Sequence, residues 1–312
     1  MGKIGGRKVT QPKVVVIGAA GMLGHKLFQV LREHFDGTLG TTLEDVRKPP
    51  FDKVELLQGN DIVTGLDVTD FAGLRKTLAG ARPDFIVNCV GIIKQRPEAT
   101  SPIPSITVNS LLPHKLATIA TGWGGRVIHF STDCVFSGRR GAYTEDDQSD
   151  ADDLYGRTKY LGEVTVPNAL TLRTSIIGRE LVEHRSLLDW FLAQNRKSVR
   201  GYRNVIYSGV TTNEIANVVA RVIREFPTLS GLYQVVSTPI SKYDLLCLLR
   251  DAFGLAVDLT PDDTEVSDRS MKGDKFRIAT GYLAPPWLSM VRQLAEDSTP
   301  YEEWLPALLR ES

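Results

Sequence analysis

The stretch from residue 14 to residue 31 constrains the fold of this chain more than any other. Val14 to Ile17 is a run of four apolar residues, typical of a buried strand, and the glycine-rich segment GAAGMLG (18–24) follows it directly. Apolar residues at helical spacing continue to Leu31. Glycines between a strand and a helix allow a tight turn, close approach of a pyrophosphate and close packing of the helix on the sheet. The segment therefore predicts a dinucleotide-binding turn, with an ordinary glycine-rich turn as the alternative.

Strand and helix patterns alternate through the first half of the chain. Alternation of this kind predicts the α/β class, with a doubly wound parallel sheet that carries helices on both faces and a ligand at the carboxyl ends of its strands. Asp70 is placed to cap one of the helices. The predicted strands are Val14–Ile17, Thr38–Leu43, a segment within Asp61–Val68, Phe85–Val90, Arg126–Ser131 and Ala169–Arg173, and the predicted helices are Met22–His34, Phe71–Leu78, Pro113–Thr121 and Tyr155–Val164.

The second half is less regular. Thr211 to Glu214 resembles a capping box, and so does Ser241 to Asp244, with Asp in place of the usual Glu. These boxes predict helices over Ile215–Glu225 and Tyr243–Phe253. The acidic and polar segment Thr260–Ser270 is predicted to be a loop, and a final helix is expected after Pro286.

A hydroxyl pair and a Tyr/Lys pair point to oxidoreductase chemistry. Ser131 and Thr132 end a predicted strand, and Tyr155 and Lys159 are four residues apart, so they share one face of a helix. An ammonium beside a phenol lowers the pKa of the phenol, which makes it a usable general acid or base. Thr132 could hold a carbonyl oxygen in line with the Tyr155 hydroxyl. These groups suit the reduction of a ketone or the oxidation of an alcohol.

The segments STDCVFSG (131–138) and YGRTKYLGE (155–163) resemble the extended branch of the short-chain dehydrogenase/reductase superfamily, and within it the dTDP-4-dehydrorhamnose reductase family. The resemblance runs from about Val14 to the low 280s. It implies a Rossmann-like sheet with a smaller C-terminal substrate domain, and hydride transfer from a nicotinamide cofactor to a nucleotide sugar. Two positions depart from the family pattern, since Cys134 stands where Tyr is usual and Ile176 replaces an aromatic residue that packs on the nucleotide sugar.

The same resemblance implies a division of the chain. Residues 1–12, by their polar and Gly-rich composition, are predicted to form a flexible leader. Residues 13–174 and 213–236 would form the NAD(P)-binding domain. Residues 175–212 and 237–312 would form the substrate-binding domain.

The resemblance also assigns roles to residues. Tyr155 would donate the proton, Lys159 would bind the ribose hydroxyls, and Thr132 would hold the reacting oxygen. Asp67 would bind the adenine amino group, and a turn-forming role at the strand end is an equal alternative. Asp133 likewise has two equal interpretations, a substrate contact or a turn former. The cofactor-binding residues would be Gly18, Gly21, Met22, Leu23, Gly24, Thr42, Asp67, Val68, Cys89, Val90, Gly91, Ser131, Tyr155 and Lys159.

Substrate contacts are assigned to Thr132, Asp133 and Arg269, the last because the Arg-Ser-Met-Lys stretch resembles the family's late substrate loop. Arg grips phosphate with two parallel hydrogen bonds, so polar side chains near the predicted site loops are further candidates. They are Lys94, Gln95, Arg139, Arg185, Arg200 and Arg203. Arg173 to Ser175, after the sixth strand, should border the nicotinamide.

The end of the second strand bears on the type of nicotinamide cofactor. Thr42 leaves room for a 2′-phosphate that Arg47 or Lys48 could grip, whereas Glu44 could instead hold the ribose diol. We expect NADP, with NAD as the alternative.

Composition excludes several classes of protein. Lys plus Arg and Asp plus Glu both number 37, so no global positive field draws in nucleic acid. No apolar run approaches the ~18 residues of a membrane span. The cysteines Cys89, Cys134 and Cys247 show neither disulfide nor zinc spacing, so we expect no metal site and a cytoplasmic location.

Three functions remain open at this point. The favoured one is an NAD(P)H-dependent reductase of a nucleotide-activated 4-keto-6-deoxy sugar in polysaccharide biosynthesis. The second is a nucleotide-sugar epimerase or dehydratase, and the third is a regulatory subunit that binds cofactor without turnover. The expected partner is a nucleotide sugar, and a homodimer is left open.

Overall fold

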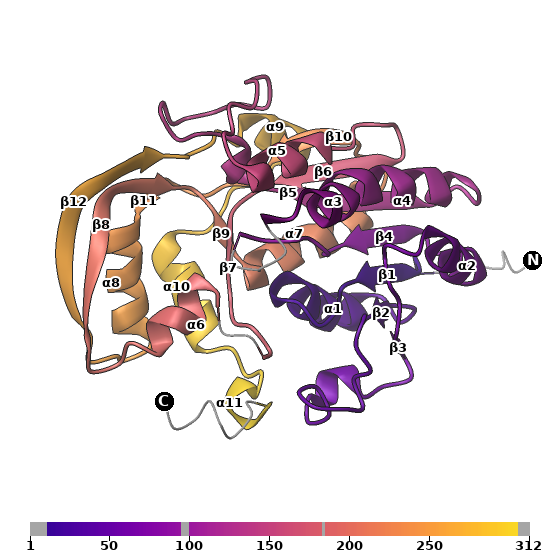
Figure 1. The fold of residues 1–312 in the computed structure, drawn as a ribbon, viewed down its shortest axis with the longest axis horizontal. Coiled ribbons are helices and arrows are strands. Elements are labelled where there is room, and N and C mark those ends of the chain that lie inside the picture. Colours follow the sequence, from indigo (N-terminus) through magenta and orange to yellow (C-terminus); the bar gives the residue numbers. More distant parts are fainter. Residues whose placement is uncertain (1–10, 95–99, 183–184, 305–312) are drawn as a thin grey trace, which may run out of the picture.

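The computed structural model describes residues 11–94, 100–182 and 185–304. Within these ranges a seven-stranded sheet forms the centre, in the order β10-β6-β5-β4-β1-β2-β3, and every neighbouring pair is parallel (Figure 1). The strands are β1 (Val14–Ile17), β2 (Leu39–Thr41), β3 (Ile62–Val63), β4 (Phe85–Asn88), β5 (Arg126–Ser131), β6 (Ala169–Arg173) and β10 (Gly231–Gln234). The predicted α/β class with a parallel sheet is confirmed.

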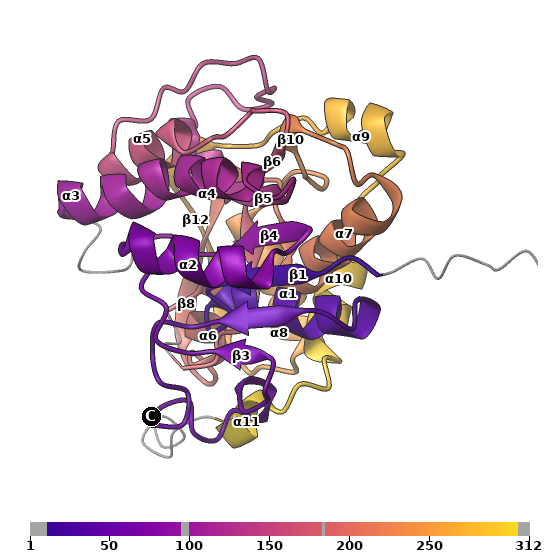
Figure 2. The same cartoon turned by 90° about the vertical axis from the view of Figure 1, so that its right-hand side faces the viewer.

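Helices cover both faces of this sheet, as Figures 1 and 2 show from two sides. The alternation along β1 explains why. Val14 and Val16 pack into the core with α1 and α7, while Val15 and Ile17 pack on the opposite face with α2 and α4. These helices are α1 (Met22–His34), α2 (Phe71–Ala81), α3 (Pro102–Ser105), a π-helical segment (Ile106–Leu111), α4 (Leu112–Thr121), α5 (Leu154–Leu161) and α7 (Thr212–Glu225).

Side-chain caps fix where several helices begin. The Asp70 carboxylate accepts hydrogen bonds from the backbone of Ala72 and Gly73, both at 3.1 Å, so α2 begins at Phe71 as predicted. Thr211 caps α7 and Ser241 caps the later helix α8 (Lys242–Ala252). The helices therefore begin at residues 212 and 242, earlier than the predicted 215 and 243.

A second group of elements lies beside the central sheet, at the left of Figure 1. Its three-stranded sheet has the order β11-β8-β12, and a separate pair joins β7 to β9. The strands are β7 (Ile176–Ile177), β8 (Ser198–Tyr207), β9 (Val210–Thr211), β11 (Ile240–Ser241) and β12 (Asp258–Asp268), and the helices near them are α6 (Leu187–Leu192), α8 and α10 (Trp287–Ala295). Two further helices lie elsewhere, α9 (Asp274–Thr280) next to β10 and α11 (Tyr301–Trp304) against α1.

The prediction of a loop over Thr260–Ser270 was wrong, because most of that segment belongs to β12. This strand runs parallel to β8, with a register shift between Asp262 and Val266. It lies at the edge of its sheet and most of its side chains are exposed, so backbone pairing rather than apolar burial holds it extended. A polar strand of this kind carries no hydrophobic period that a sequence pattern can detect.

The chain returns once to the central sheet after β6. β10 pairs with β6, from Gly231 opposite Leu170 to Gln234 opposite Arg173, and α7 lies against α1. The division of the chain into a cofactor and a substrate domain stays a prediction, and most of the predicted leader, residues 1–10, lies outside the described residues. Within the described ranges no helix is both long and apolar enough to cross a bilayer.

Candidate active site

Three neighbouring strands bring the predicted site residues to one edge of the sheet. β1, β4 and β5 are adjacent, and their register aligns Ile17 with Asn88 and Asn88 with His129. The loops that begin at Gly18, Cys89 and Thr132 therefore leave the sheet at the same edge. The chain turns to opposite sides of β1, toward β2 and toward β4, which is where open α/β sheets bind ligands.

The glycines of the turn after β1 have three distinct roles. Gly18 has a φ of 83°, and an added Cβ would lie 2.8 Å from Val90 Cγ2. Gly24 lets α1 pack on the turn, since a Cβ there would lie 1.9 Å from the Gly18 carbonyl oxygen. At Gly21 a Cβ meets only the Gly18 oxygen, at 3.5 Å, so the space above this residue is open. Met22 and Leu23 begin α1, whose first N–H groups have no partner within the helix.

The side chains at the ends of β2 and β3 serve their own loops. The Thr42 hydroxyl donates to the Glu44 carbonyl at 2.9 Å. One Asp67 carboxylate oxygen accepts hydrogen bonds from the Thr69 backbone and hydroxyl at 2.8 and 2.7 Å, which lowers the pKa of Asp67. Asp67 thus stabilises a turn in this structure, and its second carboxylate oxygen takes no part in these two hydrogen bonds. Val68 packs into the core beneath.

The segment after β4 is held from behind by a buried Asn109. Its side chain exchanges two hydrogen bonds with the backbone of Ile92, at 2.8 and 2.9 Å, and its Oδ1 would lie 3.4 Å from a Cβ at Gly91. Cys89 and Val90 lie between this support and the glycine turn, and burial raises the pKa of the Cys89 thiol.

Helix α5 carries Tyr155 and Lys159 close to the end of β5. Asp153 caps the helix by accepting from the Gly156 N–H at 2.7 Å. A Cβ at Gly156 would lie 2.2 Å from the Cys134 carbonyl oxygen, so glycine at this position lets the helix approach the turn that follows Thr132. Gly156, next to Tyr155, thereby influences how closely the Tyr155 hydroxyl approaches the Thr132 hydroxyl.

The expectation that Lys159 lowers the pKa of Tyr155 was wrong for this structure. Burial raises the pKa of the Tyr155 phenol, and hydrogen bonding with Thr132 only partly opposes this. The reason is the placement of Lys159, whose ammonium donates to the Phe130 carbonyl at 2.6 Å. Burial lowers the pKa of Lys159 to about 8, while Glu163 acts in the opposite direction. Tyr155 is therefore protonated at neutral pH, as a proton donor must be.

Thr132, Asp133 and Arg269 come together although 136 residues separate the last two in sequence. The Thr132 hydroxyl donates to the Asp133 carboxylate at 3.0 Å. Burial raises the pKa of Asp133, and the positive charges of Arg269 and Lys94 counter part of that effect. Arg269 is anchored by its Nε, which donates to the Phe136 carbonyl at 3.0 Å. Its remaining N–H groups and the Asp133 carboxylate give the site one cation and one acid.

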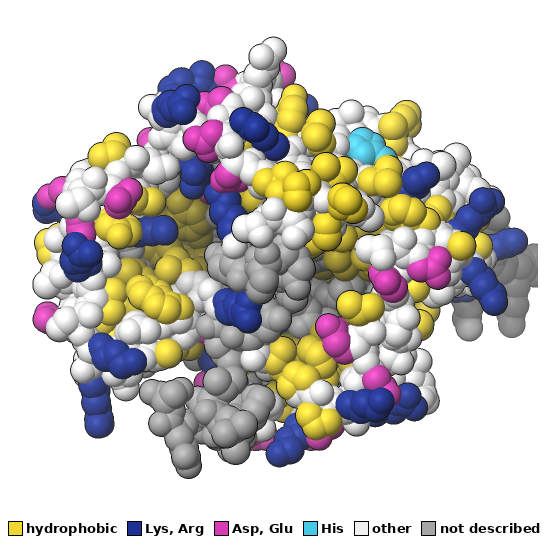
Figure 3. Space-filling model, in the orientation of Figure 1, with side chains coloured by type: hydrophobic (Ala, Val, Ile, Leu, Met, Phe, Trp, Pro, Cys, Tyr) yellow, Lys and Arg dark blue, Asp and Glu magenta, His cyan; other side chains and the backbone are white. Residues whose placement is uncertain are grey.

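Three other predicted cations are paired with carboxylates, and one of them, Lys94, lies within the site itself. Lys94 pairs with the capping carboxylate of Asp153 at 2.5 Å and lies over the Tyr155 ring, 5.8 Å from its centroid. Arg200 lies 3.0 Å from Asp262 on β12, and Arg203 pairs with Asp263 on the same strand. Gln95 lies outside the described residues. Figure 3 shows Lys and Arg side chains in dark blue beside the hollow between the two groups of elements.

A buried ion pair that the sequence did not predict supports the end of β5. Arg173 is fully buried and binds Glu163 through two hydrogen bonds, at 2.8 and 2.7 Å. Glu163 also accepts from the Ser131 hydroxyl at 2.7 Å. The guanidinium group lies 4.9 Å from the Phe136 ring centroid. Its bonds show that Arg173 holds the strand ends together, and its expected place beside the cofactor stays a prediction. A Glu directly after Gly162 and an Arg ending an apolar strand were the available signals.

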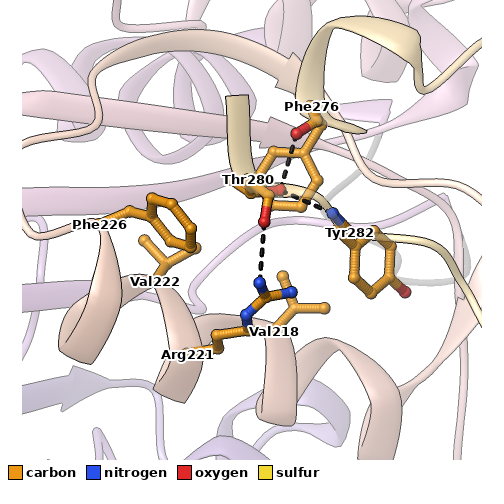
Figure 4. Close-up of a pocket in the computed structure, with 7 residues that line it drawn as sticks. All are labelled: Val218, Arg221, Val222, Phe226, Phe276, Thr280 and Tyr282. Atoms are coloured by element: carbon orange, nitrogen blue, oxygen red, sulfur yellow. Dashed lines mark hydrogen bonds between the residues drawn. The ribbon is translucent and has the colours of Figure 1, made fainter. Parts of the chain in front are cut away.

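A small cavity of about 10 Å³ between α7 and α9 is apolar and has no catalytic group (Figure 4). Arg221 closes it by donating to the Thr280 carbonyl at 2.8 Å. Its volume is about that of one water probe, so we assign it no function.

The parallel sheet, the glycine turn and the Tyr155/Lys159 helix together define a Rossmann-like fold of the short-chain dehydrogenase/reductase class. The family model described as RmlD substrate binding domain matches residues 12–274, and the chain therefore belongs to this family.

Two curated relatives and one solved structure illustrate the range of similar proteins. Methionine adenosyltransferase 2 subunit beta of Danio rerio is 27% identical over 256 residues, covering 78% of this chain and 74% of the relative. The dTDP-4-keto-6-deoxy-D-glucose reductase of Streptomyces niveus is 27% identical over 303 residues, covering 94% of each. The structure of dTDP-4-dehydrorhamnose reductase from Bacillus anthracis in complex with NADP shares the fold, with a TM-score of 0.74, 20% identity, and coverage of 92% of this chain and 100% of that one.

Proposed function

We propose that this protein is an NADPH-dependent reductase that converts the C4 carbonyl of a nucleotide-activated 4-keto-6-deoxy sugar to an alcohol. The observation that carries the proposal is the convergence of Thr132, Tyr155 and Lys159 at the end of β5, beside the glycine turn after β1. Membership of the RmlD family and the similarity to a dTDP-4-keto-6-deoxy-D-glucose reductase support it. The product class suits polysaccharide biosynthesis.

The chain's own groups supply the proton and the binding of the substrate oxygen. The Thr132 hydroxyl turns from Asp133 to donate to the carbonyl oxygen, and Tyr155 gives that oxygen its proton. Lys159, with a pKa of about 8, remains largely protonated at pH 7 and, from the same face of α5 as Tyr155, would bind the ribose hydroxyls of the cofactor. When bound, the reduced nicotinamide supplies the hydride that completes the two-electron reduction.

The glycine turn fits a dinucleotide. The open space above Gly21 and the free N–H groups at the start of α1 suit a pyrophosphate, which the positive end of the helix attracts. Gly21 would contact the pyrophosphate through its backbone, and Ser131 and Lys159 would border the nicotinamide ribose. Cys89, Val90 and Gly91 would line the opposite wall.

We predict a preference for NADPH over NADH. Arg47, in the loop that follows Thr42, has a side chain that is 77% exposed and is held by Asp45 through two hydrogen bonds, at 2.8 and 3.0 Å. A 2′-phosphate gripped by this guanidinium should favour NADPH by roughly ten- to a hundredfold. Comparing kcat/KM for the two cofactors in the native protein and in Arg47→Ala checks this. Equal use of both by the native protein would show that Glu44 or solvent sets the ribose pocket.

The decisive experiment follows NADPH oxidation with a panel of nucleotide 4-keto-6-deoxy sugars. We expect turnover of at least one, and none of the matching free sugar, because binding of the diphosphate helps to position the carbonyl. Similar rates on free sugars or simple ketones would contradict a site built around a nucleotide. Interconversion of nucleotide sugars without net cofactor consumption would instead identify an epimerase or dehydratase.

The relatives named methionine adenosyltransferase 2 subunit beta favour a second candidate, a regulatory subunit that binds cofactor without turnover. The retained Thr132, Tyr155 and Lys159 argue against it, since a subunit that only binds has no need of a proton donor. Tight NADPH binding with no turnover across the whole panel, together with a change in the activity of an added methionine adenosyltransferase, would support this candidate.

A reducing cytoplasm suits the three free cysteines, Cys89, Cys134 and Cys247. We propose the nucleotide sugar as the principal partner and leave a homodimer as an arrangement that light scattering of the purified protein will test.

A further inference from the structure

Tyr207, the last residue of β8, lies between the two groups of elements. Its ring packs 5.4 Å from that of Trp287. A Cβ at Gly209 would lie 2.5 Å from Tyr207 Cε2 and 2.2 Å from the Ser175 carbonyl oxygen, so the ring lies against the segment that follows β6. This segment continues into Ile176, which pairs with Val210. Tyr207 thus reaches from the substrate side of the molecule to the carboxyl edge of the central sheet.

The hydroxyl of Tyr207 is buried and has no hydrogen-bond partner among the described residues. A buried hydroxyl without a partner lowers stability, and Phe would fill the same space without that cost. Retaining a hydroxyl here is therefore unfavourable for folding alone, which makes it a candidate for contact with a ligand.

The strand end at Tyr207 is tied to the segment that carries Asp133. The Arg269 N–H donates to the Ile206 carbonyl at 3.1 Å, and the Arg269 Nε donates to the Phe136 carbonyl at 3.0 Å. The negative charge of Asp133 also raises the pKa of Tyr207, after the larger effect of burial. Asp133 is also hydrogen-bonded to Thr132, the residue assigned to the reacting oxygen. A phosphate between Tyr207 and Asp133 would be repelled by the carboxylate. A neutral hydroxyl suits both groups, because it accepts from the phenol and donates to the acid.

We propose that Tyr207 and Asp133 together bind the C3 hydroxyl of the sugar, which makes Tyr207 a specificity-determining residue. This inference rests on the proposed function. In a 4-keto-6-deoxy pyranose the carbons next to C4 are C3, which carries a hydroxyl, and C5, which carries the ring oxygen and the methyl group. Since Asp133 adjoins Thr132, the hydroxyl next to the carbonyl is the one placed to bridge the two side chains.

The test compares Tyr207→Phe with Tyr202→Phe, a control on the same strand. Both are assayed with NADPH and the best nucleotide 4-keto-6-deoxy sugar, and with its 3-deoxy analogue. For Tyr207→Phe we expect KM to rise about tenfold with a smaller change in kcat, NADPH affinity to be unchanged, and the melting temperature without ligand to stay the same or rise. With the 3-deoxy analogue the native protein and Tyr207→Phe should perform alike.

Three results would overturn the proposal. The first is native kinetics in Tyr207→Phe while the native protein turns over the sugar. The second is a melting temperature several degrees below native, which would mean that the hydroxyl is bonded within the protein. The third is an undiminished difference between native protein and Tyr207→Phe on the 3-deoxy analogue. Absence of turnover by the native protein would instead contradict the proposed function, so the two failures are distinct.

Discussion

Strands β5 and β12 show how differently the two parts of this protein hold extended chain. β5 has a parallel strand on each side and helices over both faces, and five of its six residues are buried. β12 is an edge strand paired with β8 in the described part of the chain, and of its eleven residues only Asp262 is buried. β5 ends at the groups assigned to chemistry, and β12 leads into Arg269, which is assigned to substrate. The groups assigned to catalysis thus lie at the end of a buried strand, whereas Arg269, assigned to substrate binding, follows an exposed strand.

The largest effect should come from the proton donor on the buried side. Tyr155→Phe removes only the hydroxyl, and general acid catalysis typically contributes ~10²–10⁴ in rate. We expect kcat to fall by that order while NADPH affinity stays nearly unchanged. Stopped-flow or steady-state assays check the rate, and a fluorescence titration checks the binding. Full activity in Tyr155→Phe would mean that the proton donor does not lie at the end of β5. The contrast between a buried catalytic side and an exposed recognition side would then be wrong.

The second prediction separates binding from packing within the glycine turn. Gly21→Val places a side chain in open space, so NADPH affinity should fall by on the order of tenfold or more while the melting temperature is kept. Gly24→Ala is the matched comparison. Its Cβ would lie 1.9 Å from the Gly18 carbonyl oxygen, so it should lower the melting temperature as well as the affinity. Native NADPH affinity in Gly21→Val would show that the turn is purely structural.

The third prediction concerns the cost of burying Lys159. Its pKa falls from an ordinary 10.5 to about 8 on folding, so between these values the unfolded chain binds more protons and stability rises with pH. Below pH 8 the full free-energy cost of burying the charged Lys159 ammonium is present. Lys159→Met removes it, and at pH 7 we expect a gain of ~1–3 kcal/mol with a loss of activity. Urea titration measures the gain.

The control for this substitution is Lys76→Met on the exposed face of α2, which should leave both stability and activity near native. A Lys159→Met variant less stable than native at pH 7 would mean that the hydrogen bond to the Phe130 carbonyl outweighs the burial penalty.

The smallest effect should come from the exposed side. Arg203 on β8 and Asp263 on β12 form an ion pair in which both side chains are 53% exposed. Solvent and salt screen such pairs, so Arg203→Ala should change neither the melting temperature nor kcat/KM measurably. A clear loss of stability would show that charge pairing, rather than backbone pairing, holds β12 to β8.

How well the sequence predicts a helix or strand depends on how the residues of that element are buried. The strand Arg126–Ser131 and the helix Met22–His34 were predicted with their observed bounds, because burial leaves a readable apolar pattern. The helix around Tyr155 begins one residue earlier than predicted, where Asp153 caps it, and ends at Leu161. β12 could not be predicted, since its polar residues have no period and its partner β8 lies some sixty residues away in the sequence.

The sequence by itself determined the class of fold and pointed to the candidate reacting groups, because strand runs, glycine spacing and an i, i+4 pair are local patterns. Only the tertiary structure decided the electrostatics of the site. The ammonium of Lys159 turns to the Phe130 carbonyl, and burial keeps Tyr155 protonated. It also decided that Arg269, from a distant segment, is anchored to the turn after Asp133 through the Phe136 carbonyl. Distances across folded elements and the loss of water around a charge depend on the whole packed chain, and no local pattern encodes them.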